Sequence, residues 1–510
     1  MQRSQDTQHD RPAQGLTQRT LGGLFWASSG ALVQLVLQVA TLVLFARLLT
    51  PADFGLIGAA MVIIGFGQIF AQLSVGSAIV QRARLAARHV RTGFTLSLLL
   101  GMLLSGLMVV LAPLIAQFFR MSALTPVVQA LAPIFLLRGV GVVAAALLQR
   151  NMRFRLLARV EIISFGIGYG VVGLTLAWLG YGVWALVGAH LGQVTLETMM
   201  LLIAQPHPKR FAVNRRACRE LMAFGSGFTM AKVANFFALQ GDNMVVGRWL
   251  GADALGLYSR AYRLMSFPAN LFGETVERVL FPALSQAQDD DQRLSMAYRR
   301  GMALTALLVM PASAIAIVLG PELVHVALGP SWKGAVLPLQ VLAVGMFFRT
   351  GYKLSGTLAR AKGAVHRLAF YHAIYAVLVV AGAWIGHWAG LAGVAWGVVG
   401  ALAIQYLLLA RLSISVTSLR WREFIGAHAS AVALTVVVAM IVWSVAAWLR
   451  GWEASAALVL IGALIAVGMS LCVLIWLAPV FWLGKDGVWW LHTLSRYGSL
   501  DFKLLRYVKT

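Results

Sequence analysis

Apolar runs of membrane-spanning length, almost free of charged residues, recur along this sequence. Each run holds about 20 residues or more, enough to cross a hydrocarbon core about 30 Å thick as a helix. Only 12% of all residues are charged, about half the share found in a typical soluble domain. The pattern predicts an all-α polytopic membrane protein with about 14 transmembrane helices. We expect them at residues 21–46, 55–81, 92–119, 124–149, 157–179, 182–204, 221–247, 254–282, 301–319, 335–358, 367–388, 390–411, 424–449 and 454–478.

The positions of the positive charges predict the orientation of these helices. Of 42 Lys and Arg residues, 30 fall in alternate loops and the two ends, 5 in the other loops and 7 within helices. Lys and Arg concentrate on the cytoplasmic side of membrane proteins, so we expect both termini in the cytoplasm. Contacts of these loops with anionic lipid headgroups account for the net charge of +24 and argue against a nucleic-acid partner.

Two similar stretches indicate an internal repeat. ARLLTPADFGLIGAA at 46–60 matches GRWLGADALGLYSRA at 247–261, an offset of 201 residues. Six helices precede the basic linker and six follow it, so both halves begin on the same side and the repeat is parallel. We expect two six-helix lobes around a central cavity plus two extra C-terminal helices. The expected segments are a cytosolic N-terminal segment 1–20, an N-lobe 21–204, the cytosolic linker 205–220, a C-lobe 221–412, extra helices within 413–478 and a cytosolic tail 479–510.

The motifs of common nucleotide-binding and catalytic sites are missing from the sequence. It has no GxxxxGK[ST] loop and no HExxH, CxxC or GxSxG motif. Cys218 and Cys472 lie far apart, so they imply no disulfide framework. We therefore expect neither an enzyme nor a bound cofactor or metal. A transporter without an ATP site runs on an ion gradient, such as H⁺ or Na⁺, or on the gradient of its substrate.

Charged side chains inside the predicted helices are the candidate functional residues. A charge at the bilayer centre costs about 3 kcal/mol on insertion scales, so such residues usually face a wet cavity. Seven Lys and Arg residues stand there against five carboxylates, which suits an anionic substrate because the arginine fork matches phosphate or carboxylate oxygens. The alternative is a structural ion pair or a side chain reaching the headgroups, which we expect for Glu161, Glu197 and Lys353. The candidate substrate-binding cations are Arg260, Arg263, Lys232, Arg138 and Arg349.

Asp242 is the candidate coupling residue. It lies in the outer third of the predicted helix 221–247. A carboxylate at that depth either binds H⁺ or Na⁺ or pairs with a cavity arginine, and the sequence leaves both readings open.

Longer motifs resemble a known family. The stretch ARLLTPADFGLIGAAMVIIGFGQIFAQLSVGSAIVQR, paired with DNMVVGRWLGADALGLYSRAYRLMSFPANLFGETVERVLFPALS, is similar to the polysaccharide-transport (Wzx-type) flippases of the MOP superfamily. LLQRNMRFRLLARVEI, ALGPSW and LARAKG add to the resemblance, which runs from Leu21 to Leu412.

This resemblance implies two lobes around a cavity that opens alternately to either side. The implied cargo is an undecaprenyl-diphosphate-linked oligosaccharide of O-antigen, capsule or exopolysaccharide, moved from the inner to the outer leaflet of a bacterial inner membrane. The family's cavity cations imply that Lys232, Arg260 and Arg263 hold the diphosphate or acidic sugars, whereas Arg138 and Arg349 match no family motif. The implied partners are this glycan, membrane lipids, and a polymerase or other glycan-assembly proteins.

Three other functions remain as alternatives. A drug or cation antiporter of the same superfamily would favour acidic binding residues, whereas this interior is basic. A lipid II flippase shares the two extra helices and a cationic cavity. A polyprenyl-linked glycan polymerase or glycosyltransferase, which is an enzyme, usually carries a large external loop, and the longest one expected here is 320–334.

Overall fold

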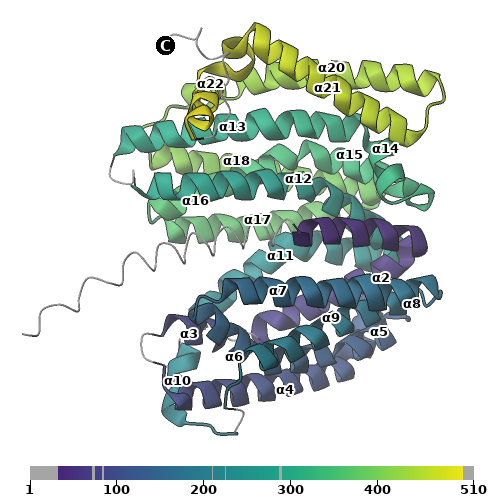
Figure 1. The fold of residues 1–510 in the computed structure, drawn as a ribbon, viewed down its shortest axis with the longest axis vertical. Coiled ribbons are helices and arrows are strands. Elements are labelled where there is room, and N and C mark those ends of the chain that lie inside the picture. Colours follow the sequence, from purple (N-terminus) through teal and green to yellow (C-terminus); the bar gives the residue numbers. More distant parts are fainter. Residues whose placement is uncertain are drawn as a thin grey trace, which may run out of the picture. The chain divides into compact units, whose positions relative to one another are not determined.

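The chain is helical throughout the part that the structure, a computed structural model, describes, with no strand in residues 33–71, 75–82, 85–208, 211–223, 226–286 and 290–497 (Figure 1). Within these residues, nine helices are long and apolar enough to span a membrane, or ten if one bent pair counts as a span. This confirms a multi-pass, all-α membrane protein.

The expected number of 14 spans is not confirmed. Part of the difference lies in helices α11 (Ser226–Trp249) and α12 (Gly251–Gln286), which carry charges and are not among the nine. Another part lies in Val33–Leu48, whose described length is short, and in Val365–Ser415, which is one candidate although two helices form it.

Contacts divide the chain into two compact units, the first ending at Val233 and the second beginning at Ala234. The predicted lobe and linker boundaries stay a prediction. After Val33–Leu48, the helices of the first unit are α2 (Pro51–Ala71), α3 (Val75–Gln81), α4 (Ala87–Phe119), α5 (Leu124–Leu131), α6 (Pro133–Arg150), α7 (Phe154–Phe165), the π-helix η1 (Gly166–Gly173), α8 (Leu174–Trp178), α9 (Val183–Ala204) and α10 (Arg215–Ala223). Helix α11 crosses the boundary between the units.

The second unit continues with α12 and ten further helices, interrupted by two short 3-10 helices. They are α13 (Asp291–Val318), α14 (Gly320–Ala327), η2 (Pro330–Ala335), α15 (Val336–Val344), α16 (Met346–Ala361), α17 (Val365–Gly386), η3 (His387–Ala389), α18 (Gly390–Ser415), α19 (Trp421–Gly426), α20 (Ala429–Gly451), α21 (Ala456–Leu477) and α22 (Pro479–Tyr497).

At both copies of the repeated stretch, a local hydrogen bond or a glycine conformation accounts for the break between two helices. Thr50 precedes α2, and its hydroxyl donates to the Asp53 carboxylate at 2.7 Å while its backbone N–H donates to the same oxygen at 3.0 Å. At the matching position, Gly251 has a φ of +89°, a conformation that favours glycine, and α12 begins there. Helix α2 therefore begins at Pro51 and α12 at Gly251, which is within one residue of the position that the 201-residue offset predicts.

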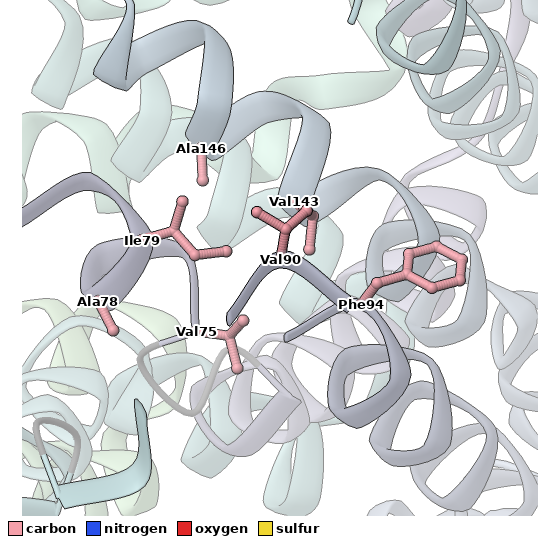
Figure 2. Packing of buried hydrophobic residues seen from close by; sticks show 7 residues of the cluster. All are labelled: Val75, Ala78, Ile79, Val90, Phe94, Val143 and Ala146. Atoms are coloured by element: carbon pink, nitrogen blue, oxygen red, sulfur yellow. The ribbon is translucent and has the colours of Figure 1, made fainter. Parts of the chain in front are cut away.

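Apolar side chains fill the core where α3, α4 and α6 meet in the first unit. Figure 2 shows this cluster from close by; it consists of Val75, Ala78, Ile79, Val90, Phe94, Val143 and Ala146. The guanidinium of Arg150, at the end of α6, donates to the carbonyl oxygens of Ile79 at 3.0 Å and Val80 at 3.2 Å. The arginine thereby satisfies backbone carbonyls that the end of α3 leaves without a helical partner.

The linker between the predicted lobes docks onto α4. The backbone N–H groups of Ala212 and Asn214 donate to the hydroxyls of Thr95 at 3.2 Å and Thr92 at 3.1 Å. The Asn214 side chain then caps α10 by accepting from the backbone of Ala217 at 3.0 Å. The segment expected to be a cytosolic linker therefore includes the start of α10 and packs against α4 within the first unit.

Helix α22 lies within the segment expected to be a cytosolic tail and packs against α13. Asp486 accepts from Arg299 at 3.0 Å, and the Arg300 guanidinium lies 4.0 Å from the ring centre of Trp489. The indole N–H of Trp490 donates to the backbone carbonyl of Arg300 at 3.2 Å. These contacts fix the C-terminal helix to the start of α13.

Candidate functional site

A buried polar cluster joins α11 and α12 in the second unit. Asp242 on α11 is only 2% exposed. Its carboxylate accepts from the Tyr258 hydroxyl at 2.9 Å and from the backbone N–H of Asn243 at 2.8 Å. Because a buried carboxylate is costly without donors, these hydrogen bonds are what hold Asp242 in the interior.

Arg349 on α16 lies in the same cluster and is 6% exposed. Its guanidinium donates to the Tyr262 hydroxyl and lies 5.0 Å from the centre of that ring. Asp242 and Arg349 interact electrostatically, but each forms its hydrogen bond with its own tyrosine. The structure thus brings two sequence-predicted residues together through Tyr258 and Tyr262, whose ring centres are 6.2 Å apart.

Lys353, one turn after Arg349, binds α12 as well. Its ammonium donates to the side-chain carbonyl of Asn270 at 2.9 Å. The structural ion pair or headgroup contact expected for Lys353 stays a prediction, since the partner in this contact is a neutral amide.

The remaining cations predicted for the diphosphate have more accessible side chains. Arg260 and Arg263 both lie on α12, three residues apart and therefore on one face. Arg260 is half-buried and Arg263 is exposed. Lys232 on α11 is also exposed, and it belongs to the first unit whereas the two arginines belong to the second.

Arg138 is far from this cluster in sequence and lies within the first unit. Its guanidinium donates to the side-chain carbonyl of Gln68 at 2.8 Å. Both residues line a cavity of about 300 Å³, together with Glu161, Gln193 and Glu197. The cavity therefore combines one cation with two carboxylates and two amides.

Sequence reasoning missed the tyrosines and glutamines of these two sites. Tyr258 and Tyr262 lie four residues apart in the charged stretch that holds Arg260, so they share a helix face with each other. That spacing inside a predicted span was the available signal. Gln68 and Gln193 gave none, because a single glutamine in an apolar helix does not identify its partner.

No group of three or more His, Cys, Asp or Glu side chains in the described residues is arranged to hold a metal ion.

Comparison with known proteins identifies related sequences. The model of the family described as polysaccharide biosynthesis protein matches residues 44–337. The teichuronic acid biosynthesis protein TuaB of Bacillus subtilis is 25% identical over 70% of this chain and 74% of its own length. The succinoglycan biosynthesis transport protein ExoT of Rhizobium meliloti is 29% identical over 61% of this chain and 63% of its own. The lipopolysaccharide biosynthesis protein WzxC of Escherichia coli is 23% identical over 69% of this chain and 71% of its own.

Solved structures share the fold. The lipid II flippase MurJ in an inward closed conformation superposes with a TM-score of 0.73, covering 89% of this chain and 98% of MurJ at 16% identity. An inward-facing multidrug resistance transporter of the MATE family in the MOP superfamily gives a TM-score of 0.61, covering 75% of this chain and 94% of its own at 16% identity. The fold is therefore of the MurJ and MATE type.

Proposed function

We propose the function of this chain from one premise: it belongs to the polysaccharide biosynthesis protein family, whose model matches residues 44–337. Its relatives are named for teichuronic acid, succinoglycan and lipopolysaccharide biosynthesis, and ExoT is named a transport protein. We propose that the chain is a flippase, not an enzyme. It moves an undecaprenyl-diphosphate-linked oligosaccharide, the repeat unit of O-antigen, capsule or exopolysaccharide, from the inner to the outer leaflet of a bacterial inner membrane.

The observation that carries the proposal is the flippase fold of a polysaccharide-biosynthesis chain. The fold of MurJ extends over 89% of this chain. Alternating access then exposes one cavity to each side of the membrane in turn. Both termini lie in the cytoplasm in this proposal, and a polymerase receives the cargo on the other side.

Arg260 and Arg263 of the second unit are the proposed diphosphate ligands. Arg349 of that unit, and Lys232 and Arg138 of the first unit, remain further candidate substrate-binding cations. Arg260 and Arg263 share a face of α12 and retain accessible surface. A diphosphate offers several acceptor oxygens, and an arginine fork binds two of them at once. Each charge-assisted hydrogen bond contributes about 1.5–3 kcal/mol, so losing one arginine weakens binding by about one to two powers of ten.

The test is a flipping assay with purified protein in vesicles. A diphosphate-linked oligosaccharide on a polyprenyl carrier is placed in the membrane, and its exposure to an impermeant glycosidase is followed. We expect Arg260→Ala and Arg260→Lys both to slow flipping, because lysine keeps the charge but loses the fork. Arg422→Ala, at an exposed position on α19, is the matched control. Normal flipping by a folded Arg260→Ala variant would remove this arginine from the site.

Lipid II is the second candidate cargo, because MurJ is a lipid II flippase with the same fold. The assay separates the two by replacing the oligosaccharide lipid with lipid II in matched vesicles. Transport of lipid II at an equal or higher rate would favour that cargo over the repeat unit of a polysaccharide.

An ion gradient, H⁺ or Na⁺, is the proposed energy source, with Asp242 as its candidate binding residue in the second unit. Asp242→Asn then transports without responding to an imposed gradient, while it still binds the lipid-linked glycan. Gradient-driven transport by this variant would exclude the coupling role, leaving Asp242 as the counter-charge of Arg349.

A further inference from the structure

An open groove between α11 and α17 of the second unit has an apolar lining throughout its described residues. It has a volume of about 580 Å³, within the range of ordinary ligand pockets, about 300–1,000 Å³. Phe237 on α11 and Val377, Val380 and Trp384 on α17 line it together with four alanines. The groove therefore suits a slender hydrocarbon chain.

A tight contact between the two helices borders this groove. A Cβ at Gly241 would lie 2.5 Å from Cγ2 of Val380, so the missing side chain lets α11 approach α17. The lining residues of α17 run from Ala373 to Trp384, about 16 Å along the helix axis. Because α17 belongs to a candidate membrane span and Val377 is exposed, we infer that the groove is open to lipid.

Four aromatic rings gather at the end of α17, and we call them the aromatic cluster. His387 is central. Its ring centre lies 4.9 Å from that of Trp388, 5.6 Å from that of Trp249 and 6.2 Å from that of Trp384. Trp384 also lines the groove. The groove and the aromatic cluster are therefore continuous.

The rings of the aromatic cluster are open to a ligand. Trp388 is 81% exposed, and Trp249 and Trp384 are exposed as well. Nδ1 of His387 donates to the backbone carbonyl of Trp384, which leaves Nε2 of the neutral ring as an acceptor. The cluster therefore offers indole faces, indole N–H donors and one imidazole acceptor.

Arg248 adds a cation at the same end of α11. It lies in the last turn of that helix, and its guanidinium is 5.7 Å from the ring centre of Trp249. In the predicted topology this end of α11 and α17 faces the outside. An apolar groove, aromatic rings and a cation thus follow one another on one unit.

These three features match the three parts of a lipid-linked glycan. Its polyprenyl chain is apolar and its phosphates are anionic. The C–H face of a sugar ring carries partial positive charge, so it stacks on the negative face of an aromatic ring. The groove alone selects no lipid, because a chain that enters it leaves surroundings that are equally apolar. Selection therefore depends on the cation and the rings.

We propose that the groove, the aromatic cluster and Arg248 form an exit site for the lipid-linked glycan on the second unit. The polyprenyl chain lies along α17, Arg248 contacts the phosphates, and the tryptophans stack on the sugars nearest the lipid. This inference rests on the proposed function and uses other residues than the diphosphate site on α12. It gives the cargo a second position, between release from that site and transfer to a polymerase.

An aromatic belt at the membrane interface is the alternative role of these tryptophans. Trp178 at the end of α8 fits that role, since it is 77% exposed and has no ring partner among the described residues. Rings that act independently in a belt predict similar effects of replacing Trp178 and Trp388. The exit site predicts an effect at Trp388 only.

The test is photo-crosslinking of the purified full chain in nanodiscs of phosphatidylethanolamine and phosphatidylglycerol. Benzoylphenylalanine replaces Val377 in the groove or, as a control, Val436 at an exposed position on α20. The probes are radiolabelled undecaprenyl diphosphate with and without a disaccharide of N-acetylglucosamine and galactose. At position 377 we expect the probe with sugars to crosslink at least fivefold more than the probe without them. At position 436 we expect equal yields.

Four substitutions then separate the parts of the site. Trp388→Ala and Trp384→Leu should each lower crosslinking of the probe with sugars about fivefold and leave the sugar-free probe unchanged, because both retain the apolar groove. Arg248→Gln should lower crosslinking of both probes, since both carry the diphosphate. Trp178→Ala is the matched control and should change neither yield.

Equal yields of the two probes at position 377 would overturn the proposal. Equal effects of Trp388→Ala and Trp178→Ala would do so too, and would assign the rings to an interfacial belt. If Trp384→Leu fails to fold, Trp388→Ala decides, because that side chain is almost fully exposed.

Failure of the exit site and failure of the proposed function are distinguishable in the flipping assay. A chain that flips the lipid-linked glycan without selective crosslinking at position 377 refutes the exit site alone. A chain that crosslinks selectively and flips no lipid-linked glycan refutes the proposed transport and retains the binding site.

Discussion

Single side chains hold the polar groups of this protein in an apolar interior, and Tyr258 is one of them. Its hydroxyl donates to Asp242 at 2.9 Å, and both residues are buried. Tyr258→Phe keeps the ring and removes the hydrogen-bond donor. We therefore expect the free energy of unfolding to fall by about 1.5–3 kcal/mol. The measurement is equilibrium unfolding of the purified protein in detergent. Tyr181→Phe, at a 56% exposed position, is the control, and an equal effect of both changes would contradict this account.

Glu220 on α10 makes the docking of the linker dependent on pH. Its carboxylate accepts from Arg82 at 2.6 Å and from His89 and Arg216 at 3.1 Å each. The pKa of Glu220 is lowered, chiefly by the hydrogen bond from His89 and then by the two arginines. A lowered pKa in the docked state means that the contact is complete above the ordinary pKa of glutamate and is lost as pH falls through the lowered value.

Cys218 on α10 reports this docking. In a Cys472→Ser background we expect Glu220→Gln to speed maleimide labelling of Cys218 at neutral pH, because α10 then separates more often from α4. The ratio of the two labelling rates approaches one as pH falls, since the unaltered protein then loses its docked carboxylate too. A ratio that stays constant with pH would argue against the role of Glu220.

Backbone contact between α17 and α18 is the feature that matters most at the scale of elements. A Cβ at Gly382 would lie 2.7 Å from the carbonyl oxygen of Gly397, and Gly386 meets Gly393 in the same way. Small residues let helices approach this closely in membranes.

Gly397→Leu should therefore destabilise the second unit, by about 1–3 kcal/mol or more, because neither backbone can move aside without losing other contacts. Gly400→Leu on the same helix is a matched control, since a Cβ there meets nothing within 4 Å. The thermal midpoints of the two purified variants provide the comparison. Equal midpoints would show that the contact tolerates a side chain.

The sequence predicted the long apolar helices better than the short polar ones. Charge-free runs such as Ala456–Leu477 have few alternatives in a membrane, so they form helices close to their predicted bounds. The helix α10 was missed because its basic residues indicate a solvated linker, and only the Asn214 cap and the contacts with Thr92 and Thr95 reveal it. The π-helical register of η1 is likewise invisible in a glycine-rich run.

Topology is the prediction that belongs to the whole molecule. The charge distribution predicts that Arg215 lies in the cytoplasm and Lys333 on the opposite side of the membrane. After Cys218 and Cys472 are replaced by serine, a cysteine introduced at each position in turn should react with an impermeant maleimide from opposite sides of the membrane. Labelling of both positions from the same side would contradict the predicted orientation.

The candidate sites were only partly readable from the sequence. Burial logic identified Arg138, Asp242 and Arg349, because charges are rare in apolar helices. It did not identify their neighbours: Arg349 contacts Tyr262, 87 residues away, and Arg138 contacts Gln68, 70 residues away. Such pairings depend on how helices pack, which the periodicity of a single helix does not contain. Glu161 and Glu197 were expected to form structural ion pairs or to reach the headgroups. That expectation did not include their place in the lining of one cavity.

The docked linker has a mechanical consequence. An unattached linker follows no single part of a protein, whereas a linker that is bound along its length to one unit moves with that unit. Residues 212–220 are fastened to α3 and α4 by Thr92, Thr95, Arg82 and His89. If the chain changes conformation as the proposed function requires, we expect residues 212–220 to move with the first unit, because the boundary between the units falls in α11. This stretch is part of the first unit, which ends at Val233, and loss of the Glu220 carboxylate would weaken its attachment to α3 and α4.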